Sequence, residues 1–310
     1  MISFEHVSKR YGTLNALQDV SFTVPKGQVL GLLGQNGAGK TTVMNIMTGC
    51  LAPTSGSVSI GGKDLLLQPR EAKRMIGYLP EAVPVYDEMT VRSYLCFACE
   101  LKEVERKAIA EHVEAVAEKT GLADVLDRKL GNLSKGYRQR AGVAQALCGT
   151  PEVIVLDEPT SGLDPKQNSE MRQLILSLAG EHTILFSSHI LSEVQAVCGR
   201  VMILHHGRII CDSALNDLQN EGHMLRVVID CREEKILPSL RQLQSVRRVD
   251  VEKNADPEVT QAVLTAENNG FVERELFTLL SALQIPLLRL SPLENSLEDV
   301  FLRATMDETT

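Results

Sequence analysis

The stretch of sequence that decides the fold is Gly34-Gln35-Asn36-Gly37-Ala38-Gly39-Lys40-Thr41. It matches the phosphate-loop pattern G-x-x-x-x-G-K-[ST] in full. The apolar run at residues 29–33 precedes it and is typical of a strand buried on both faces, and residues 41–47 are expected to form a helix. A chance glycine-rich turn would lack this flanking pattern, so the stretch predicts a site for nucleotide phosphates.

The parts of this loop have separate expected tasks. Its glycines let the backbone point N–H groups at phosphate oxygens, and the start of the next helix adds a favourable field. Lys40 is expected to reach the β- and γ-phosphates, while the Thr41 hydroxyl is expected to bind Mg²⁺. The expected nucleotide-binding residues of the loop are Gly34, Gln35, Asn36, Gly37, Ala38, Gly39, Lys40, Thr41 and Thr42.

A second apolar strand, residues 153–156, ends in two adjacent carboxylates, Asp157 and Glu158. Because α/β proteins bind ligands at the carboxyl edge of the sheet, both side chains are expected near the phosphate loop. Asp157 is expected to hold Mg²⁺ through the water shell of the ion. Glu158 is expected to orient and deprotonate an attacking water. A solvated acidic pair at the start of a loop is the alternative, which the complete phosphate loop disfavours.

Composition limits the class of protein. The chain has 310 residues, 44% hydrophobic and 23% charged, which fits a soluble globular protein of about two domains. Nucleic acid is not expected as a partner, because the net charge is −8 and Trp is absent. Residues 1–6 lack a signal-peptide pattern, and no apolar run reaches about 18 residues. The seven cysteines are therefore expected to be reduced thiols of a cytosolic protein.

Strand and helix patterns alternate through residues 1–218, which predicts an α/β domain with a mostly parallel sheet. Apolar residues alternate at 20–24 before Pro25-Lys26-Gly27 breaks the run, as a hairpin would. A helical subdomain is expected inside this domain at about residues 82–149. Within it, Thr90 is the expected N-cap of a helix and Gly121 the expected stop of the helical run.

Residues 222–310 follow a different pattern and are expected to form a small accessory domain. The order of its expected elements is β-α-β-β-α-β, the ferredoxin-like α+β arrangement. A last helix is expected at about residues 296–303. The six elements are strand 225–230, helix 233–243, strand 246–253, strand 260–267, helix 272–283 and strand 287–291.

With this phosphate loop and this pair of carboxylates, residues 1–218 resemble the ATP-binding subunits of ABC transporters. The stretch Leu133-Ser134-Lys135-Gly136-Tyr137-Arg138-Gln139-Arg140 looks like the signature sequence of that family. The resemblance implies that Ser134 and the Gly136 backbone contact the γ-phosphate of an ATP held by the opposite subunit, and that Lys135 between them is also a nucleotide-binding residue. It also implies a phosphate-loop domain with a mixed sheet, an antiparallel β subdomain and a helical subdomain.

Three further segments resemble motifs of the same family. Ser161-Gly162-Leu163-Asp164 resembles the D-loop at the dimer interface, which implies that Asp164 lies near the nucleotide. Ser187-Ser188-His189 resembles the switch segment, which implies that His189 reaches the γ-phosphate. Tyr11 is placed like the aromatic residue that stacks on adenine. Lone Tyr or His residues are more often structural, but their order among the other motifs favours these roles.

Two departures from the usual motifs suggest a branch of the family. Glu81 stands where the Q-loop usually has Gln, and a carboxylate there can still bind Mg²⁺. The signature reads Ser-Lys-Gly-Tyr in place of the commoner Ser-Gly-Gly-Gln. Both variants, and the tail at residues 296–302, resemble subunits that serve ABC-2-type exporters.

The resemblance implies how the chain works. One phosphate loop and one signature per chain imply a head-to-tail dimer, either with a second copy or with a paralogous subunit. ATP and water would give ADP and phosphate, and the cycle would power export by a separate membrane permease docked near residues 81–100. The chain is then expected at the cytoplasmic face of the membrane, bound through that permease. An ordinary surface loop is the alternative for this docking segment.

Two other functions remain open at this point. One is a soluble ABC ATPase acting on ribosomes or DNA, although such proteins usually join two ATP sites in one chain or insert a long coiled coil. The other is a non-transport, ATP-dependent clamp, which Glu158 and His189 disfavour. Cys96-Phe97-Ala98-Cys99 has a C-x-x-C spacing, but without a second pair it is expected to lie on a core-facing helix. His205-His206 is expected to form a turn before Gly207.

Overall fold

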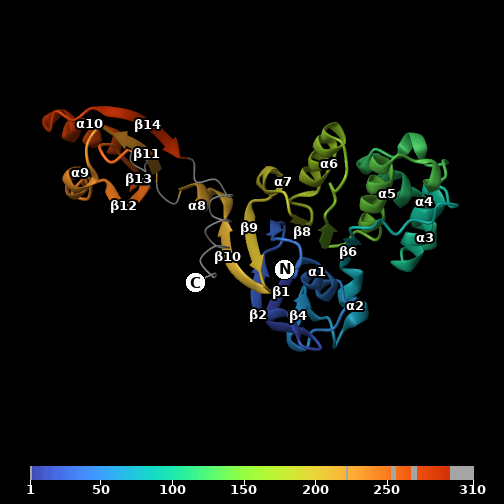
Figure 1. The fold of residues 1–310 in the computed structure, drawn as a ribbon. Coiled ribbons are helices and arrows are strands. Elements are labelled where there is room, and N and C mark those ends of the chain that lie inside the picture. The colour runs from blue at the N-terminus through green and yellow to red at the C-terminus, as the bar shows by residue number, and fades with distance from the viewer. Residues whose placement is uncertain (1, 221–222, 253–255, 267–270, 294–310) are drawn as a thin grey trace. The chain divides into compact units, whose positions relative to one another are not determined.

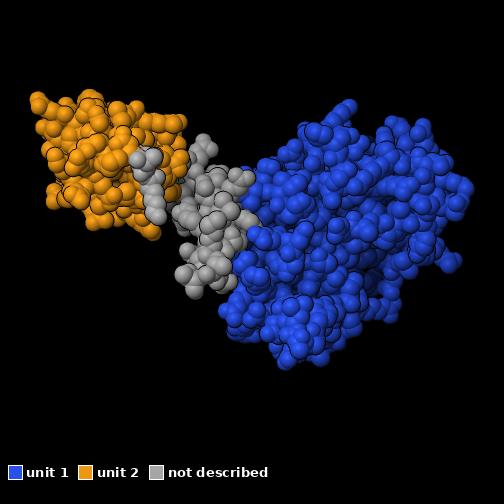
Figure 2. Space-filling view, viewed as in Figure 1, with its two compact units in different colours: residues 1–215 blue, residues 216–310 orange. Residues whose placement is uncertain are grey.

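The computed structural model describes residues 2–220, 223–252, 256–266 and 271–293. The chain forms two compact units, Met1–Leu215 and Asn216–Thr310 (Figure 1 and Figure 2). The helix expected at 296–303 and the tail at 296–302 lie outside the described residues.

A six-stranded sheet lies at the centre of the first unit. Neighbouring strands from β9 to β6 run parallel, and β10 joins the edge antiparallel to β9. Strand β3 is buried along its whole length between β8 and β9, as its unbroken apolar sequence predicts. In sheet order the strands are β10 (Arg208–Ala214), β9 (Arg200–His205), β3 (Val29–Leu33), β8 (Thr183–Ser188), β7 (Val153–Asp157) and β6 (Ile76–Leu79).

The register of this sheet brings the functional segments to one edge. Leu33 at the end of β3 pairs with Ser188 of β8, and Asp157 at the end of β7 pairs with Ser187. Helix α1 (Lys40–Met47) starts after the loop that follows β3. The phosphate loop, the paired carboxylates and the switch segment therefore leave the sheet side by side.

A second, antiparallel sheet packs over α1. Its apolar side chains share one hydrophobic core with α1 and the central sheet. Its strand order is β2-β1-β4-β5, and the rings of Phe4 and Phe22 stack with centroids 4.5 Å apart. The hairpin expected after residue 24 was wrong, because β2 pairs with β1 while β3 enters the other sheet. The alternating burial of β2 fits a one-sided sheet, whereas β3 needs cover on both faces. The elements here are β1 (Ile2–Tyr11), β2 (Leu14–Val24), β4 (Ser55–Ile60), β5 (Lys63–Asp64) and α2 (Pro69–Arg74).

Helices α3 (Val91–Leu101), α4 (Ile109–Thr120) and α5 (Lys135–Leu147) pack together beside the sheets (Figure 1). Thr90 caps α3, its hydroxyl accepting a hydrogen bond from Ser93 N at 3.1 Å, and Gly121 ends α4 with a φ of 67°. Both expectations for these two residues are confirmed. Helix α7 (Leu191–Val197) packs on the central sheet against β3 and β8, and helix α6 (Pro165–Leu178) packs against α7. The short 3₁₀ turns span Arg106–Ala108, Ala123–Val125 and Leu130–Asn132.

The second unit has the expected β-α-β-β-α-β order. Its antiparallel sheet has the strand order β12-β13-β11-β14, which is the ferredoxin-like arrangement. One face of the sheet and both helices share a core that includes Val227, Leu264 and Leu276. After α8 (Leu215–Asn220) the elements are β11 (His223–Ile229), α9 (Glu233–Leu240), β12 (Val246–Glu252), β13 (Thr260–Ala266), α10 (Val272–Ala282) and β14 (Leu287–Leu293).

Gly77 in β6 is required by the close approach of α5. A Cβ atom at this position would lie 1.9 Å from the Ala146 carbonyl oxygen, a backbone atom that cannot rotate away. We expect Gly77→Ala to lower the free energy of unfolding by about 3 kcal/mol or more, the upper end of overpacking effects. Denaturant unfolding measures this, with Gly199→Ala as the control, because a Cβ there meets nothing within 4 Å. Equal stability of the two variants would contradict this account of the β6–α5 contact.

Candidate functional site

One pocket at the carboxyl edge of the central sheet has a volume of about 660 Å³. It gathers most of the residues that the sequence singled out, from elements far apart along the chain. Of the predicted site residues, those lining it are Tyr11, Gln35, Asn36, Gly37, Gly39, Lys40, Thr41, Thr42, Glu81, Asp157, Glu158 and His189.

The phosphate loop is folded tightly against its neighbours. Gly39 precedes α1 with a φ of 110°, and a Cβ there would lie 2.8 Å from the Ala16 carbonyl oxygen. Gly34 and Ala38 do not line the pocket. A Cβ on Gly34 would lie 2.5 Å from the Leu204 carbonyl oxygen near the end of β9, and the Ala38 carbonyl oxygen accepts a hydrogen bond from Gly207 N at 2.9 Å. These contacts fix one side of the loop against its neighbours, and the remaining loop residues face the pocket.

Lys40 is buried at the floor of the pocket. Its ammonium group donates hydrogen bonds to the carbonyl oxygens of Gly34 at 2.6 Å and Gln35 at 3.3 Å. Burial lowers the pKa of Lys40, and the nearby carboxylates of Glu158 and Asp157 oppose this. The lysine is thus a single, poorly hydrated cation held next to the loop that is expected to carry the phosphates.

Ser187 joins the two carboxylates that follow β7. Its hydroxyl donates to Asp157 Oδ1 at 2.6 Å and accepts from the backbone N–H of Glu158 at 3.0 Å. Glu158 has a φ of 49°, a left-handed conformation that is rare and costly for a residue with a side chain. The hydrogen bond that the Glu158 N–H donates to Ser187 stabilises this turn, which aims the Glu158 carboxylate into the pocket.

Glu158 and His189 form a hydrogen-bonded pair. His189 Nδ1 lies 2.8 Å from Glu158 Oε2, so a ring protonated at Nδ1 donates to the carboxylate. Burial raises the pKa of Glu158, and the hydrogen bond and charge of His189, together with Lys40, oppose the rise. A carboxylate with a raised pKa and a fixed orientation is suited to accept a proton.

Glu193 on α7 organises the loops behind this pair, and sequence reasoning missed it. Its carboxylate accepts hydrogen bonds from the hydroxyls of Thr160 at 2.6 Å and Ser188 at 2.8 Å, and from the Asn168 amide at 3.0 Å. It is 4% exposed, although its sequence context is that of an ordinary surface residue of a helix. The carboxylate thereby links the segment after Glu158 to the switch segment.

The structure places the signature residues and Asp164 outside this pocket. Ser134 caps α5 and accepts a hydrogen bond from Tyr137 N at 3.4 Å, and Asp164 caps α6 by accepting from Gln167 N at 2.8 Å. Lys135 approaches the D-loop, where a Cβ on Gly162 would lie 2.0 Å from its Nζ atom. Within one chain, the signature therefore takes no part in the lining of the pocket.

Residues of strand β2 and of the β9–β10 turn also line the pocket, and sequence reasoning assigned them no role there. They include Asn15, Gln18 and His206. His206 has a φ of 44° and stands in the turn that its sequence predicts, but only the folded chain brings it beside the phosphate loop. Their positions depend on strand pairing between distant segments, for which the local sequence has no signal.

Three oxygen-bearing side chains of the pocket have the chemistry that a divalent cation needs. Thr41, Glu81 and Asp157 all line it, and hydroxyl and carboxylate oxygens are the ligands that Mg²⁺ prefers. Burial raises the pKa of Asp157, and the charge of Glu81 raises it further. A cation would relieve this repulsion, so the residues fit a magnesium ion.

Comparison with known proteins decides the family. The chain matches the ABC transporter family over residues 17–161. It is 39% identical to the ABC transporter ATP-binding protein NatA of Bacillus subtilis, over 70% of this chain and 91% of NatA. This chain belongs to the ABC transporter ATP-binding proteins.

Two other relatives extend the comparison. The bacitracin transport ATP-binding protein BcrA of Bacillus licheniformis is 30% identical over 98% of this chain and 96% of its own length. The dimeric structure of a bacterial ABC transporter cassette superposes with a TM-score of 0.63 at 25% identity, covering 69% of this chain and 99% of the cassette. The expected fold of the ATP-binding domain is thereby confirmed.

As an ABC transporter ATP-binding protein, the chain binds ATP, and its family implies hydrolysis of that ATP. Among the described residues, the structure contains no helix long and apolar enough to cross a membrane.

Proposed function

We propose that this ABC ATPase hydrolyses ATP as one half of a head-to-tail dimer and powers export by a separate membrane permease of the ABC-2 type. The observation that carries the proposal is the separation of phosphate loop and signature within one chain. Most residues of the phosphate loop and both members of the acidic pair line the pocket, while Ser134 and Gly136 lie outside its lining. A second subunit can supply the missing signature, and a twofold dimer completes two such sites at once.

Within each site the residues of one chain divide the work. Lys40 binds the β- and γ-phosphates once its hydrogen bonds to the loop carbonyls are exchanged for phosphate oxygens. Glu158 orients a water in line with the γ-phosphorus and takes its proton as the bond to the ADP oxygen breaks. His189 holds the Glu158 carboxylate and reaches the γ-phosphate. Tyr11, 47% exposed at the mouth of the pocket, stacks on the adenine ring.

Magnesium completes this proposal. Thr41, Glu81 and Asp157 would hold the ion, directly or through its waters. When bound, it would neutralise charge on the β- and γ-phosphates. Removal of divalent cations with a chelator is therefore expected to stop hydrolysis.

The proposed permease contact is the segment 81–100. Exposed aromatic rings gather here, with Tyr86 56% and Phe97 37% exposed and their centroids 6.1 Å apart. The buried Tyr94 packs against Tyr86, with ring centroids 6.4 Å apart. Its hydroxyl donates a hydrogen bond to the Pro84 carbonyl oxygen at 3.2 Å. Exposed aromatic residues on a rigid base are typical anchors of protein interfaces.

The pH dependence of hydrolysis follows from the raised pKa of Glu158. Only the ionised carboxylate accepts the proton of water, so the rate is expected to fall as pH decreases through that pKa. The midpoint should lie above about 4.3, the value of an ordinary glutamate. A profile of kcat against pH measures this, with Glu158→Gln as the control, since its residual rate should lack this acid limb. The same acid limb in both proteins would contradict the role of Glu158.

Replacing both Tyr86 and Phe97 with Ala is expected to weaken permease binding at least about tenfold, because aromatic anchors at interface centres carry most of the affinity. The ATPase activity of the isolated chain should be unchanged. The matched control is Phe277→Ala, which removes a ring that is 68% exposed in the second unit. Unchanged recovery of the permease with the double variant would contradict the proposed contact.

Affinity capture from native membranes tests the transport proposal. Tagged Glu158→Gln protein, held with ATP, is recovered from detergent-solubilised membranes and its partners are identified by mass spectrometry. A stoichiometric protein with several membrane spans is the expected partner. Recovery of ribosomal or DNA-repair proteins, or of this chain alone, would contradict the transport proposal and leave the ATPase assignment standing.

A further inference from the structure

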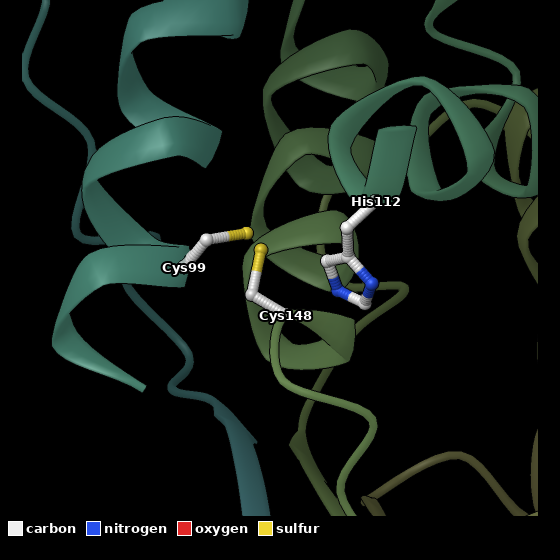
Figure 3. Close-up of side chains that lie close together, drawn as sticks. All are labelled: Cys99, His112 and Cys148. Atoms are coloured by element: carbon white, nitrogen blue, oxygen red, sulfur yellow. The ribbon is translucent and has the colours of Figure 1, made fainter. Parts of the chain in front are cut away.

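Two cysteines and a histidine lie close together between helices α3, α4 and α5, and none of them lines the ATP pocket. Cys99 lies on α3, His112 on α4 and Cys148 at the C-cap of α5 (Figure 3). Their sulfur and nitrogen atoms all lie within 4.8 Å of one another. Both cysteines are fully buried. Figure 3 shows the two sulfur atoms facing each other with the imidazole ring beside them.

We propose that Cys99, His112 and Cys148 bind a zinc ion. Two thiolates and one imidazole are a ligand set that zinc prefers, and three protein ligands leave a fourth position for water. With Zn–S and Zn–N bonds of about 2.3 and 2.0 Å, ligand atoms on a tetrahedral ion stand about 3.3–3.8 Å apart. The present spacing, at most 4.8 Å, therefore needs the ligand atoms to approach one another by at most about 1.5 Å.

The charge balance of the proposed site suits its burial. Zinc would displace one proton from each thiol, so that Zn²⁺ and two thiolates together carry no net charge. A buried ion compensated within its own ligand shell avoids the large cost of an unpaired charge.

The present contacts of the three side chains are weak enough to be exchanged. The Cys148 thiol donates long hydrogen bonds to the carbonyl oxygens of Ala144 at 3.5 Å and Leu95 at 3.7 Å. His112 Nε2 accepts a hydrogen bond from Gly149 N–H at 3.1 Å, so it is the unprotonated nitrogen that a metal requires. Zinc would replace this single neutral hydrogen bond.

A zinc ion here would crosslink the three helices α3, α4 and α5. It would join α3, α4 and the end of α5, whose first turn begins at the signature residue Ser134. The same two sulfurs could instead form a disulfide. In the structure both thiols are free, and the reduced chain is the form that can bind the metal.

Titration of the reduced, chelator-treated full chain with Co²⁺ tests the site. Cobalt bound by thiolates has a sulfur-to-metal charge-transfer absorption, which the oxygen ligands of the ATP pocket cannot produce. We expect one equivalent to bind, Zn²⁺ to displace it, and Zn²⁺ to raise the thermal midpoint of the protein. Cys99→Ser or Cys148→Ser should weaken binding by more than about 100-fold, since loss of mere supporting contacts already costs about 10–100-fold.

The matched control is Cys96→Ser, which removes a half-buried thiol one turn earlier on α3 and should leave the absorption unchanged. Absence of the absorption in the wild-type chain would overturn the site, and so would its survival in both ligand variants. If the ligand variants do not fold, X-ray absorption of the zinc-loaded wild type decides. Two sulfur ligands on the metal are expected there, and none would overturn the proposal.

Discussion

Glu158→Gln is expected to lower steady-state ATP hydrolysis by about 10²–10⁴-fold, the range that general-base catalysis contributes. The amide keeps the size of the side chain but cannot accept the proton of the attacking water. Its oxygen can still accept a hydrogen bond from His189, so ATP binding should survive. Hydrolysis is measured as phosphate release at saturating ATP, and binding as equilibrium affinity for ATP.

The matched control for this variant is Glu152→Gln, which changes a partly exposed carboxylate just before the opposite end of β7. It should hydrolyse ATP at the wild-type rate. If Glu158→Gln hydrolysed ATP like the parent chain, Glu158 would not be the general base, although the phosphate-binding role of the pocket would stand.

Lys40→Ala is expected to lower ATP affinity by about 100-fold or more. Each hydrogen bond between charged groups contributes roughly 1.5–3 kcal/mol, and Lys40 is placed to give at least two to the phosphates. The loss is also electrostatic, because the pocket would keep the carboxylates of Glu81, Asp157 and Glu158 without its buried cation. Equilibrium titration with a fluorescent ATP analogue measures this affinity.

Lys26→Ala is the control for this loss of charge. Lys26 lies in the turn before β3 with its side chain 72% exposed, so its removal should leave ATP affinity unchanged. Equal affinity of the Lys40→Ala variant and the wild type would contradict the assignment of the pocket to ATP phosphates.

Local sequence was enough to predict the elements that carry the phosphate loop. The apolar run at 29–33, the glycines and the following helix are contiguous, so each supports the others without any long-range contact. The order of elements in the second unit was also predicted from local sequence, because its strands and helices have distinct apolar patterns. Helix α9, expected to reach residue 243, ends at Leu240, a difference of the size usual for helix ends.

Contacts between distant segments could not be predicted. The hydrogen bond between His189 and Glu158 and the three bonds to Glu193 depend on how β7, β8 and α7 pack. The hairpin expected after Val24 was wrong for the same reason, since pairing partners are chosen by burial and not by the turn residues alone. The grouping of Cys99 with Cys148 likewise has no signal in the C-x-x-C spacing, which points to a different pair.

The measurement that tests the central claim most directly is the mass in solution of Glu158→Gln protein, by light scattering after gel filtration. With ATP and magnesium, we predict the mass of two chains. With ADP, or with Ser134→Arg added to block the signature, we predict the mass of one chain. A single-chain mass at saturating ATP, or a dimer indifferent to both nucleotide and Ser134→Arg, would contradict an ATP site shared between two copies of this chain.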